Sequence, residues 1–437
     1  MADLVNNLWV LIAGLLVFTM TVSVGLLEVG ELGGLLSRNV LKTLLITGSA
    51  LVVMAFVGFN TAFAPTVLGG AIGNPTYQGL FLGGLGGSHA NYGPDPLGGI
   101  WWSTAGVQNL YTGTYFLFET AFAAVTLALV GVVVLKKVKL TSFLLFSIPY
   151  FIVIWNLPAA WIWNPSGWLA KLGMADFAGG LVVHGAAGAA GLAILVQIWR
   201  EERASGLAAS EQVPTNVQPS WLTLAILLLW VGWFGFNPGS VLAFNWEAIV
   251  VVLTTFLAAA TSCFSTMMWS WLVSRRTPSY LEASNGVLMG LIVITPLAGF
   301  VSPASAIVLG LLCGPIFIHA ERWFGRRHWF SDPVGLLPGH LVGGLFGILM
   351  IGFFAESFYA RGAFNSSLPN GLLYGGGTAA LHQVGIELFG SFVVLVTVFA
   401  LSFAAIWAIA KAMGGITVRP AAASERPVSA VAPEVVT

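Results

Sequence analysis

Eleven apolar segments, each about as long as a bilayer is thick, constrain this chain more than any other feature. A spanning helix needs about 20 predominantly apolar residues. Such segments occupy residues 8–29, 43–65, 112–135, 141–162, 177–198, 220–238, 247–273, 283–300, 304–321, 338–356 and 385–410. The weakest, 283–300, is short and carries Ser284 and Asn285. Because backbone polar groups find no water in hydrocarbon, we expect an all-α polytopic membrane protein with eleven transmembrane helices.

Composition and charge support this class. Of the 437 residues, 57% are hydrophobic and 8% are charged, whereas a soluble domain carries about 25% charged residues. The formal net charge is zero, which gives no indication of a nucleic-acid or acidic partner. Cys263 and Cys313 lie in apolar segments and are too few for a disulfide framework or a thiolate metal site. The N-terminus lacks the basic region of a signal peptide, so we expect the first apolar segment to be retained.

The basic residues predict the orientation. With the N-terminus outside, all but two of the 17 lysines and arginines fall in inner loops and the tail, the exceptions being Lys171 and Arg361. Short cytoplasmic loops carry such an excess, so we predict an outer N-terminus and an inner C-terminus. The membrane domain is expected to cover residues 1–415. Residues 416–437 are rich in proline, alanine and serine and are expected to form a disordered cytoplasmic tail.

Two of the apolar segments carry a histidine in the same setting. His184 and His340 are each followed by glycines four and seven positions later. Glycine-lined faces let two helices approach closely, so we expect the two histidines to meet. They fall in the fifth and tenth segments, which predicts two five-helix halves of opposite orientation plus an eleventh helix. Inverted repeats of this kind often place a substrate pathway at their interface.

The paired histidines leave several roles open. Two unrelated buried histidines, each bonded to a backbone carbonyl, are the simplest alternative, but the matching glycine spacing favours a pair. Burial favours the neutral imidazole, which has one donor and one acceptor nitrogen. A facing pair could share a proton, contact a small molecule or relay protons. A metal site would need further ligands. Because His89, His319, His328 and His382 lie in a loop or toward membrane edges, we expect no metal centre and no cofactor.

Two carboxylates lie near the predicted outer face. Asp176 begins the fifth segment, eight residues and roughly 12 Å of helix before His184. It could cap that helix, attract a cation at the outer mouth, or do both. Glu119 follows Phe118 in the third segment; it faces an outer cavity or pairs with another helix, and the sequence does not choose between them.

Aromatic residues gather at the same outer ends. Phe118 and Phe122 are four residues apart, so they share a helix face. Trp163 ends the fourth segment, while Phe236 and Ser240 end the sixth. Most such residues form an interfacial belt. A subset could form a cage for a small cation, because aromatic faces attract cations once water is removed, and Ser240 would add a hydrogen-bond acceptor.

Four motifs together resemble the ammonium transporter, methylammonium permease and Rhesus family, and their order fits over about residues 10 to 415. They are Asp-Phe-Ala-Gly-Gly-Leu-Val-Val-His at 176–184, Gly-Trp-Phe-Gly-Phe-Asn-Pro-Gly-Ser at 232–240, Ile-Thr-Pro-Leu-Ala-Gly-Phe at 294–300, and the stretch from 340 to Gly-Phe-Phe-Ala at 352–355. The resemblance implies a non-enzymatic, multi-pass protein of the cell membrane. It also implies a homotrimer in which each subunit has its own pore.

The resemblance also implies roles for individual residues. Phe122 and Phe236 would form a stacked phenyl gate. Trp163 and Ser240, with Phe118 nearby, would form an outer ammonium site. His184 and His340 would be the paired histidines of the pore. Glu119 stands where the family commonly has glutamine, and Gly335 stands where it commonly has aspartate. The tail lacks the usual Gly-Leu-Asp and His-Gly-Glu segments, which disfavours a PII-type signalling protein as a partner.

The favoured function is therefore transport of ammonium or ammonia, with recruitment and deprotonation of the cation at the outer aromatic site. A Rhesus-like channel for neutral ammonia or carbon dioxide is an alternative, and the aromatic cage with Ser240 argues against it. A sensor that binds ammonium and signals through a partner is another, disfavoured by the absence of a signalling domain. An intramembrane metalloenzyme is the least favoured.

Overall fold

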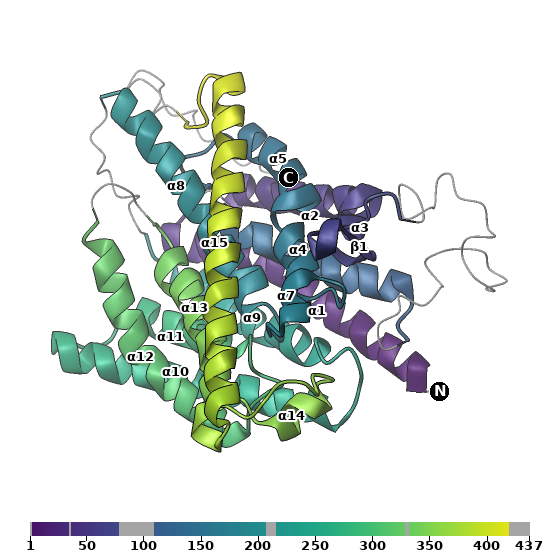
Figure 1. Ribbon diagram of the computed structural model, residues 1–437. Coiled ribbons are helices and arrows are strands. Elements are labelled where there is room, and N and C mark those ends of the chain that lie inside the picture. Colours follow the sequence, from purple (N-terminus) through teal and green to yellow (C-terminus); the bar gives the residue numbers. More distant parts are fainter. Residues whose placement is uncertain (1, 35, 78–108, 207–215, 328–331, 419–437) are drawn as a thin grey trace, which may run out of the picture.

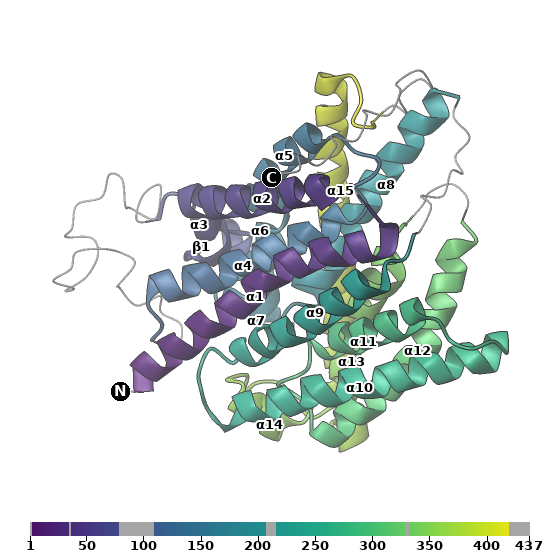
Figure 2. The same cartoon turned by 180° about the vertical axis from the view of Figure 1, so that it is seen from behind.

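The computed structural model is a bundle of long helices, shown from opposite sides in Figures 1 and 2. It describes residues 2–34, 36–77, 109–206, 216–327 and 332–418. The α-helices are α1 Ala2–Leu32, α2 Leu36–Val53, α3 Phe59–Phe63, α4 Thr112–Gly131, α5 Leu140–Pro149, α6 Asn156–Ile162, α7 Trp168–Leu172, α8 Ala186–Ala204, α9 Pro219–Gly239, α10 Trp246–Ser274, α11 Tyr280–Ile294, α12 Pro303–Gly325, α13 Val342–Phe354, α14 Ser357–Gly362 and α15 Gly377–Met413. Four π-helical turns join or open these helices: η1 Met54–Gly58, η6 Tyr150–Ile154, η7 Gly180–Gly185 and η8 Leu337–Leu341. Two 3-10 turns, η2 Leu68–Gly70 and η9 Leu372–Tyr374, and the hairpin β1 Thr66–Val67 and β2 Ile72–Gly73 complete the described elements.

The predicted all-α polytopic membrane fold is confirmed. Within the described residues, ten helices are long and apolar enough to cross a membrane. The eighth predicted segment, 283–300, is the exception, because its helix α11 covers only Tyr280–Ile294. Pro296 explains this early end: it has no amide hydrogen to continue the helix, and it disfavours helical geometry at the residue before it. Residues 295–300 form turns instead. The count of eleven spans and the orientation stay predictions.

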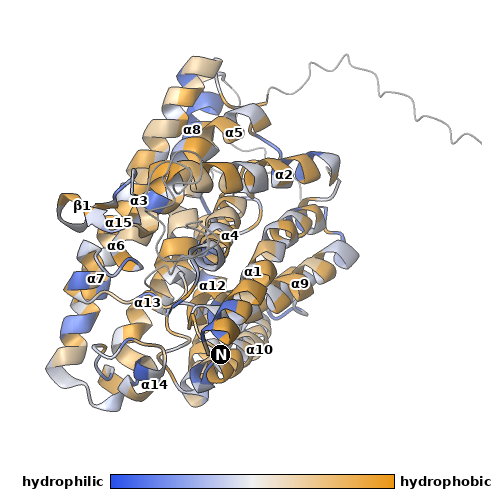
Figure 3. Cartoon of the chain, turned by 90° about the vertical axis from the view of Figure 1, so that its right-hand side faces the viewer, coloured by the Kyte–Doolittle hydropathy of each residue, from blue (hydrophilic) through white to orange (hydrophobic). Residues whose placement is uncertain are grey.

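The helices pack through small residues. Helix α1 lies along α9 and α4, and α15 runs the length of the molecule against α8 (Figures 1 and 2). A Cβ added at Gly235 of α9 would lie 2.5 Å from the carbonyl oxygen of Ala13 in α1. Only glycine therefore allows this approach of the two backbones, as is common where membrane helices cross. Figure 3 shows that α1, α2 and α9 consist mostly of hydrophobic residues. Several of their large apolar side chains are exposed, among them Leu8, Leu44 and Leu227, as expected of helices that meet lipid.

A cluster of buried polar side chains joins α1 to α2. Glu28 of α1 accepts hydrogen bonds from Lys42 and Asn39 of α2, and all three side chains are buried. Lys42 was predicted to lie in an inner loop, whereas it is the seventh residue of α2, nearly two turns inside the helix. A buried ion pair of this kind fixes the register of two helices, because removing one partner leaves an unpaired charge.

The start of the predicted tail is held against the bundle. Glu201, near the end of α8, accepts hydrogen bonds from the backbone amides of Ile416 and Thr417. Val138 forms a β-bridge with Thr417. Residues 416 and 417, just past the expected boundary at residue 415, are therefore held against the bundle. Residues 419–437 lie outside the described residues.

Candidate functional site

The segment that carries His184 is organised by one carboxylate. The Oδ1 atom of Asp176 accepts from the amides of Gly179 and Gly180 at 2.9 and 2.7 Å, and its Oδ2 accepts from those of Leu181 and Val182, both at 2.9 Å. Gly179 has φ +110°, a left-handed conformation that turns the chain so that these amides point at the carboxylate. Four otherwise orphaned donors at the start of η7 are thereby satisfied.

The segment that carries His340 repeats this arrangement. Asp332 precedes His340 by eight residues, as Asp176 precedes His184. Its two carboxylate oxygens accept from the amides of Leu336 and Leu337 at 3.0 and 2.7 Å. Both segments then enter the bundle as π-helical turns, η7 and η8. Asp332 was not among the residues predicted from the sequence, although its spacing of eight residues from His340 equals that of Asp176 from His184.

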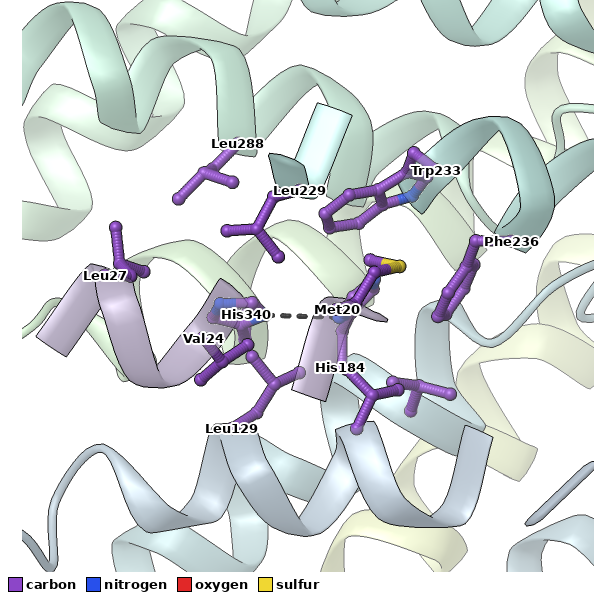
Figure 4. A pocket seen from close by; sticks show the side chains of 12 residues that line it. Met20, Val24, Leu27, Leu129, His184, Leu229, Trp233, Phe236, Leu288 and His340 are labelled. Carbon is purple, nitrogen blue, oxygen red and sulfur yellow. Dashed lines mark hydrogen bonds between the residues drawn. The ribbon is translucent and has the colours of Figure 1, made fainter. Parts of the chain in front are cut away.

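The two histidines meet inside the bundle. The Nδ1 atoms of His184 and His340 lie 3.1 Å apart, within hydrogen-bond distance (Figure 4). One of the two must donate and the other accept, so they cannot both present an N–H along this contact. His184 also stacks on Trp233 and Phe236, with ring centroids 5.6 and 5.9 Å apart. Its Nε2 atom is buried and has no hydrogen-bond partner among the described residues, which leaves a polar atom free for a small molecule.

Close backbone contact makes this pairing possible. Gly344 of α13 faces His184, and a Cβ added there would lie 3.1 Å from the His184 Cβ and nearer still to the carbonyl oxygen of Gly180. Contact that tight requires glycine.

We expect Gly344→Val to destabilise the protein by about 1–3 kcal/mol, because overpacking forces neighbouring backbones apart. Thermal unfolding in detergent measures this change. The matched control is Gly385→Val, since a Cβ at Gly385 meets nothing within 4 Å. Equal unfolding temperatures for the two variants would contradict the role given to this contact.

A second group of residues lines a cavity beside the N-terminal half of α4. We name this cavity the outer pocket. Its lining residues are Tyr115, Phe118, Glu119, Phe122, Trp163, Phe177, Ser240 and Leu242. Four residues predicted for an outer site, Phe118, Phe122, Trp163 and Ser240, therefore lie around one cavity. The predicted set did not include Tyr115, Phe177 or Leu242. Glu119, for which the sequence left open either an outer cavity or a partner on another helix, lines this cavity.

Asp176 is not among the residues that line the outer pocket. The indole Nε1 of Trp163 donates to the backbone carbonyl of Asp176 at 2.8 Å, so the aspartate segment orients one wall of the pocket. Both carboxylate oxygens are occupied by backbone amides. Asp176 therefore positions the Trp163 wall of the outer pocket and the start of η7, and its negative charge lies against the backbone amides at that start.

Two phenyl rings separate the outer pocket from the histidines. Phe122 and Phe236 lie with ring centroids 4.2 Å apart and an interplanar angle of 34°. Both side chains are buried. Phe122 lines the outer pocket, whereas Phe236 lines the cavity on the other side, next to His184. The ring pair thus forms the boundary between the two cavities.

The cavity beyond the rings, here the central cavity, is apolar except for the two histidines (Figure 4). It is lined by Met20, Val24, Leu27, Val125, Leu129, Val183, His184, Leu229, Trp233, Phe236, Leu288 and His340. His340 also lines a further cavity, the inner cavity, together with Asn285, Val334 and Gly335 among others. The outer pocket, the ring pair, the histidines and the inner cavity therefore follow one another through the bundle.

The other histidines lie apart from this pathway. His319 of α12 accepts from Trp269 Nε1 of α10 at 3.3 Å, and His382 lies in the first turns of α15. His89 and His328 lie outside the described residues. Among the residues that the structure describes, no three of His, Cys, Asp and Glu gather in a way that could hold a metal ion.

Comparison with known proteins places this pathway in a family. The sequence pattern of the Ammonium Transporter Family matches residues 8–426. The chain belongs to the ammonium transporter family. This is a family of transporters and not of enzymes, and the resemblance drawn from the four motifs is confirmed.

Individual members of the ammonium transporter family resemble most of this chain. An ammonium transporter of Bacillus subtilis is 31% identical over 384 residues, which are 87% of this chain and 86% of that protein. The crystal structure of Saccharomyces cerevisiae Mep2 is 25% identical with a TM-score of 0.80, covering 96% of this chain and 88% of that one. A structure described as a sensor Amt protein is 25% identical with a TM-score of 0.79, covering 96% of each chain.

Proposed function

We propose that this protein passes ammonium or ammonia across the cell membrane along the pathway that runs from the outer pocket, between the two phenyl rings and past the paired histidines. The observation that carries the proposal is the contact of His184 with His340, the polar groups of an otherwise apolar central cavity. Membership of the ammonium transporter family supports the substrate.

The outer pocket is the recruitment site in this proposal. Trp163, Phe118 and Phe122 present aromatic rings to it, and such faces attract a cation that has shed its water. Ser240 donates its hydroxyl proton to the Phe236 carbonyl at 2.9 Å, so its oxygen offers lone pairs to the pocket. An ammonium ion can donate hydrogen to that oxygen while its charge lies against the rings.

Beyond the rings, the cost of charge decides which species moves. A cation in an apolar membrane cavity costs at least several kcal/mol, whereas a neutral molecule that can hydrogen-bond costs far less. Loss of a proton near Phe122 and Phe236 therefore lowers the barrier. Ammonia then passes His184 and His340, and the proton follows through the imidazoles or along water. Potassium has no proton to lose, so it is excluded despite its similar size.

Uptake of labelled methylammonium into vesicles that contain the purified protein tests this function. We expect protein-containing vesicles to take up the label faster than protein-free ones, with competition by ammonium and none by potassium. Uptake equal to that of protein-free vesicles would reject transport by this chain.

A sensor is the second candidate, because one of the similar structures is described as a sensor Amt protein. A sensor would bind ammonium at the same outer pocket without carrying it. Binding of methylammonium to the purified protein, with no uptake above the protein-free rate, would favour this alternative. A channel for neutral ammonia or carbon dioxide would instead give uptake without electrical current.

Membership of the family also supports a proposal about the oligomeric state of the protein and the membrane in which it lies. We propose a homotrimer in the cell membrane, with one complete pathway in each subunit, since all the residues of the pathway come from one chain.

A further inference from the structure

Glu119 is a buried carboxylate in the wall of the outer pocket. It lies on α4 between Phe118 and Phe122, and its residue is only 5% exposed. Tyr115, one turn earlier, hydrogen-bonds to it. Its Oε2 atom is buried and has no hydrogen-bond partner in the described part of the chain. No lysine or arginine of the described residues forms an ion pair with it.

An arrangement of this kind is costly without a ligand. A buried polar atom that lacks a partner costs about 1–3 kcal/mol, and more when it is charged. A cation bound in the outer pocket would offset the cost of burying this carboxylate and would gain a charge-assisted bond to it. The other walls suit such a cation, because they are aromatic rings and the Ser240 oxygen.

Asp176 and Glu119 differ in whether their carboxylate oxygens have hydrogen-bond partners. The four backbone amides bound by Asp176 leave its oxygens without a role in the pocket. Glu119 has one oxygen held by Tyr115 and one directed to no described group. Of the residues that line the outer pocket, Glu119 is the only acidic one.

We propose that Glu119 is a ligand of the bound cation and sets the affinity of the outer pocket for small cations that carry N–H groups, such as ammonium and methylammonium. This proposal rests on the proposed function. The Glu119 carboxylate and the Ser240 oxygen both belong to residues that line the outer pocket, and together they hold the ion among its aromatic faces. The carboxylate strengthens capture, and the later steps past Phe236 and the histidines do not involve it.

Glu119→Gln tests this role, because glutamine keeps the size and the hydrogen-bonding capacity and removes the charge. We expect the half-saturating concentration of methylammonium uptake to rise on the order of tenfold, the difference between a charged and a neutral hydrogen bond. The maximal rate should stay within about twofold, because the steps beyond the rings are unchanged. Calorimetric binding of methylammonium to the purified variant should weaken by the same factor.

Glu247→Gln is the matched control. Glu247 is also a buried carboxylate without hydrogen-bond partners among the described residues, and it lies in the first turn of α10 away from the outer pocket. This variant should keep the half-saturating concentration of the unaltered protein. If Glu119→Gln does not fold, Glu119→Asp, which keeps the charge but withdraws it by one methylene, should raise that concentration at least threefold.

The outcomes separate the two proposals. An unchanged half-saturating concentration and unchanged binding in Glu119→Gln or Glu119→Asp would overturn the role of Glu119, as would a fall in maximal rate alone. An equal rise in Glu247→Gln would also overturn it, because the effect would then not belong to the pocket. If the unaltered protein shows no uptake, transport is rejected, and the calorimetric comparison alone decides whether Glu119 is a cation ligand.

Discussion

Replacing both His184 and His340 with alanine is expected either to abolish ammonium transport or to remove its discrimination against potassium. The imidazoles supply the polar atoms of a central cavity whose other lining side chains are aliphatic, thioether or aromatic. Without them, ammonia loses its hydrogen-bond partners and the proton loses its relay. The alternative result, passage of potassium, is expected if water fills the space that the two rings leave and solvates an ion there.

The measurement compares methylammonium uptake and potassium flux in vesicles for the double variant and for each single variant. His319→Ala is the matched control, since His319 pairs with Trp269 on α10 and lies outside the three cavities. It should behave as the unaltered protein does. Normal ammonium transport with full selectivity in the double variant would show that the histidine pair has no part in the pathway.

Replacing Asp176 with alanine is expected to have the largest effect on stability. The change leaves four buried backbone amides without their acceptor at the start of η7. A bond to a charged group contributes about 1.5–3 kcal/mol, and bonds to one carboxylate are not additive, so we expect a loss of about 3–5 kcal/mol, the range seen when a buried charged partner is removed. His184 and the Trp163 wall lose their positions with it, and uptake should cease.

Asp332→Ala provides the comparison for this prediction. The Asp332 carboxylate accepts from the amides of Leu336 and Leu337 at the equivalent position before η8. We expect a smaller loss of stability for this variant, because the Asp332 side chain is only partly buried, whereas Asp176 is buried. The thermal unfolding temperatures of the purified Asp176→Ala and Asp332→Ala proteins give the order of their stabilities. An Asp176→Ala protein as stable as the unaltered one would refute the organising role of this carboxylate.

The sequence predicted those parts of the structure that depend on length, apolarity and spacing. Ten of the predicted segments agree with helices that can span a membrane, because an unbroken apolar run leaves the backbone no other partner. The histidine pair followed from glycines at equal spacing, because a bare helix face permits close approach. The aromatic outer pocket could be predicted because Phe118 and Phe122 are four residues apart and therefore lie on the same face of a helix.

Other features depend on contacts that no local pattern specifies. Met20, Val24 and Leu27 line the central cavity from α1, yet in the sequence they are ordinary apolar residues of a membrane helix. Glu119 could be placed only once Tyr115 and the facing Ser240 were seen around the same pocket. The short helix α11 depends on Pro296, whose effect a hydropathy average does not contain.

The most direct test of the proposed pathway is the electrical current that the purified protein carries on a supported membrane, first in an ammonium pulse and then in a potassium pulse. We expect a transient current with ammonium and none with potassium, because only ammonium can cross the apolar cavity as ammonia with its proton following. A potassium current of the same size, or no response to ammonium in either current or methylammonium uptake, would contradict it.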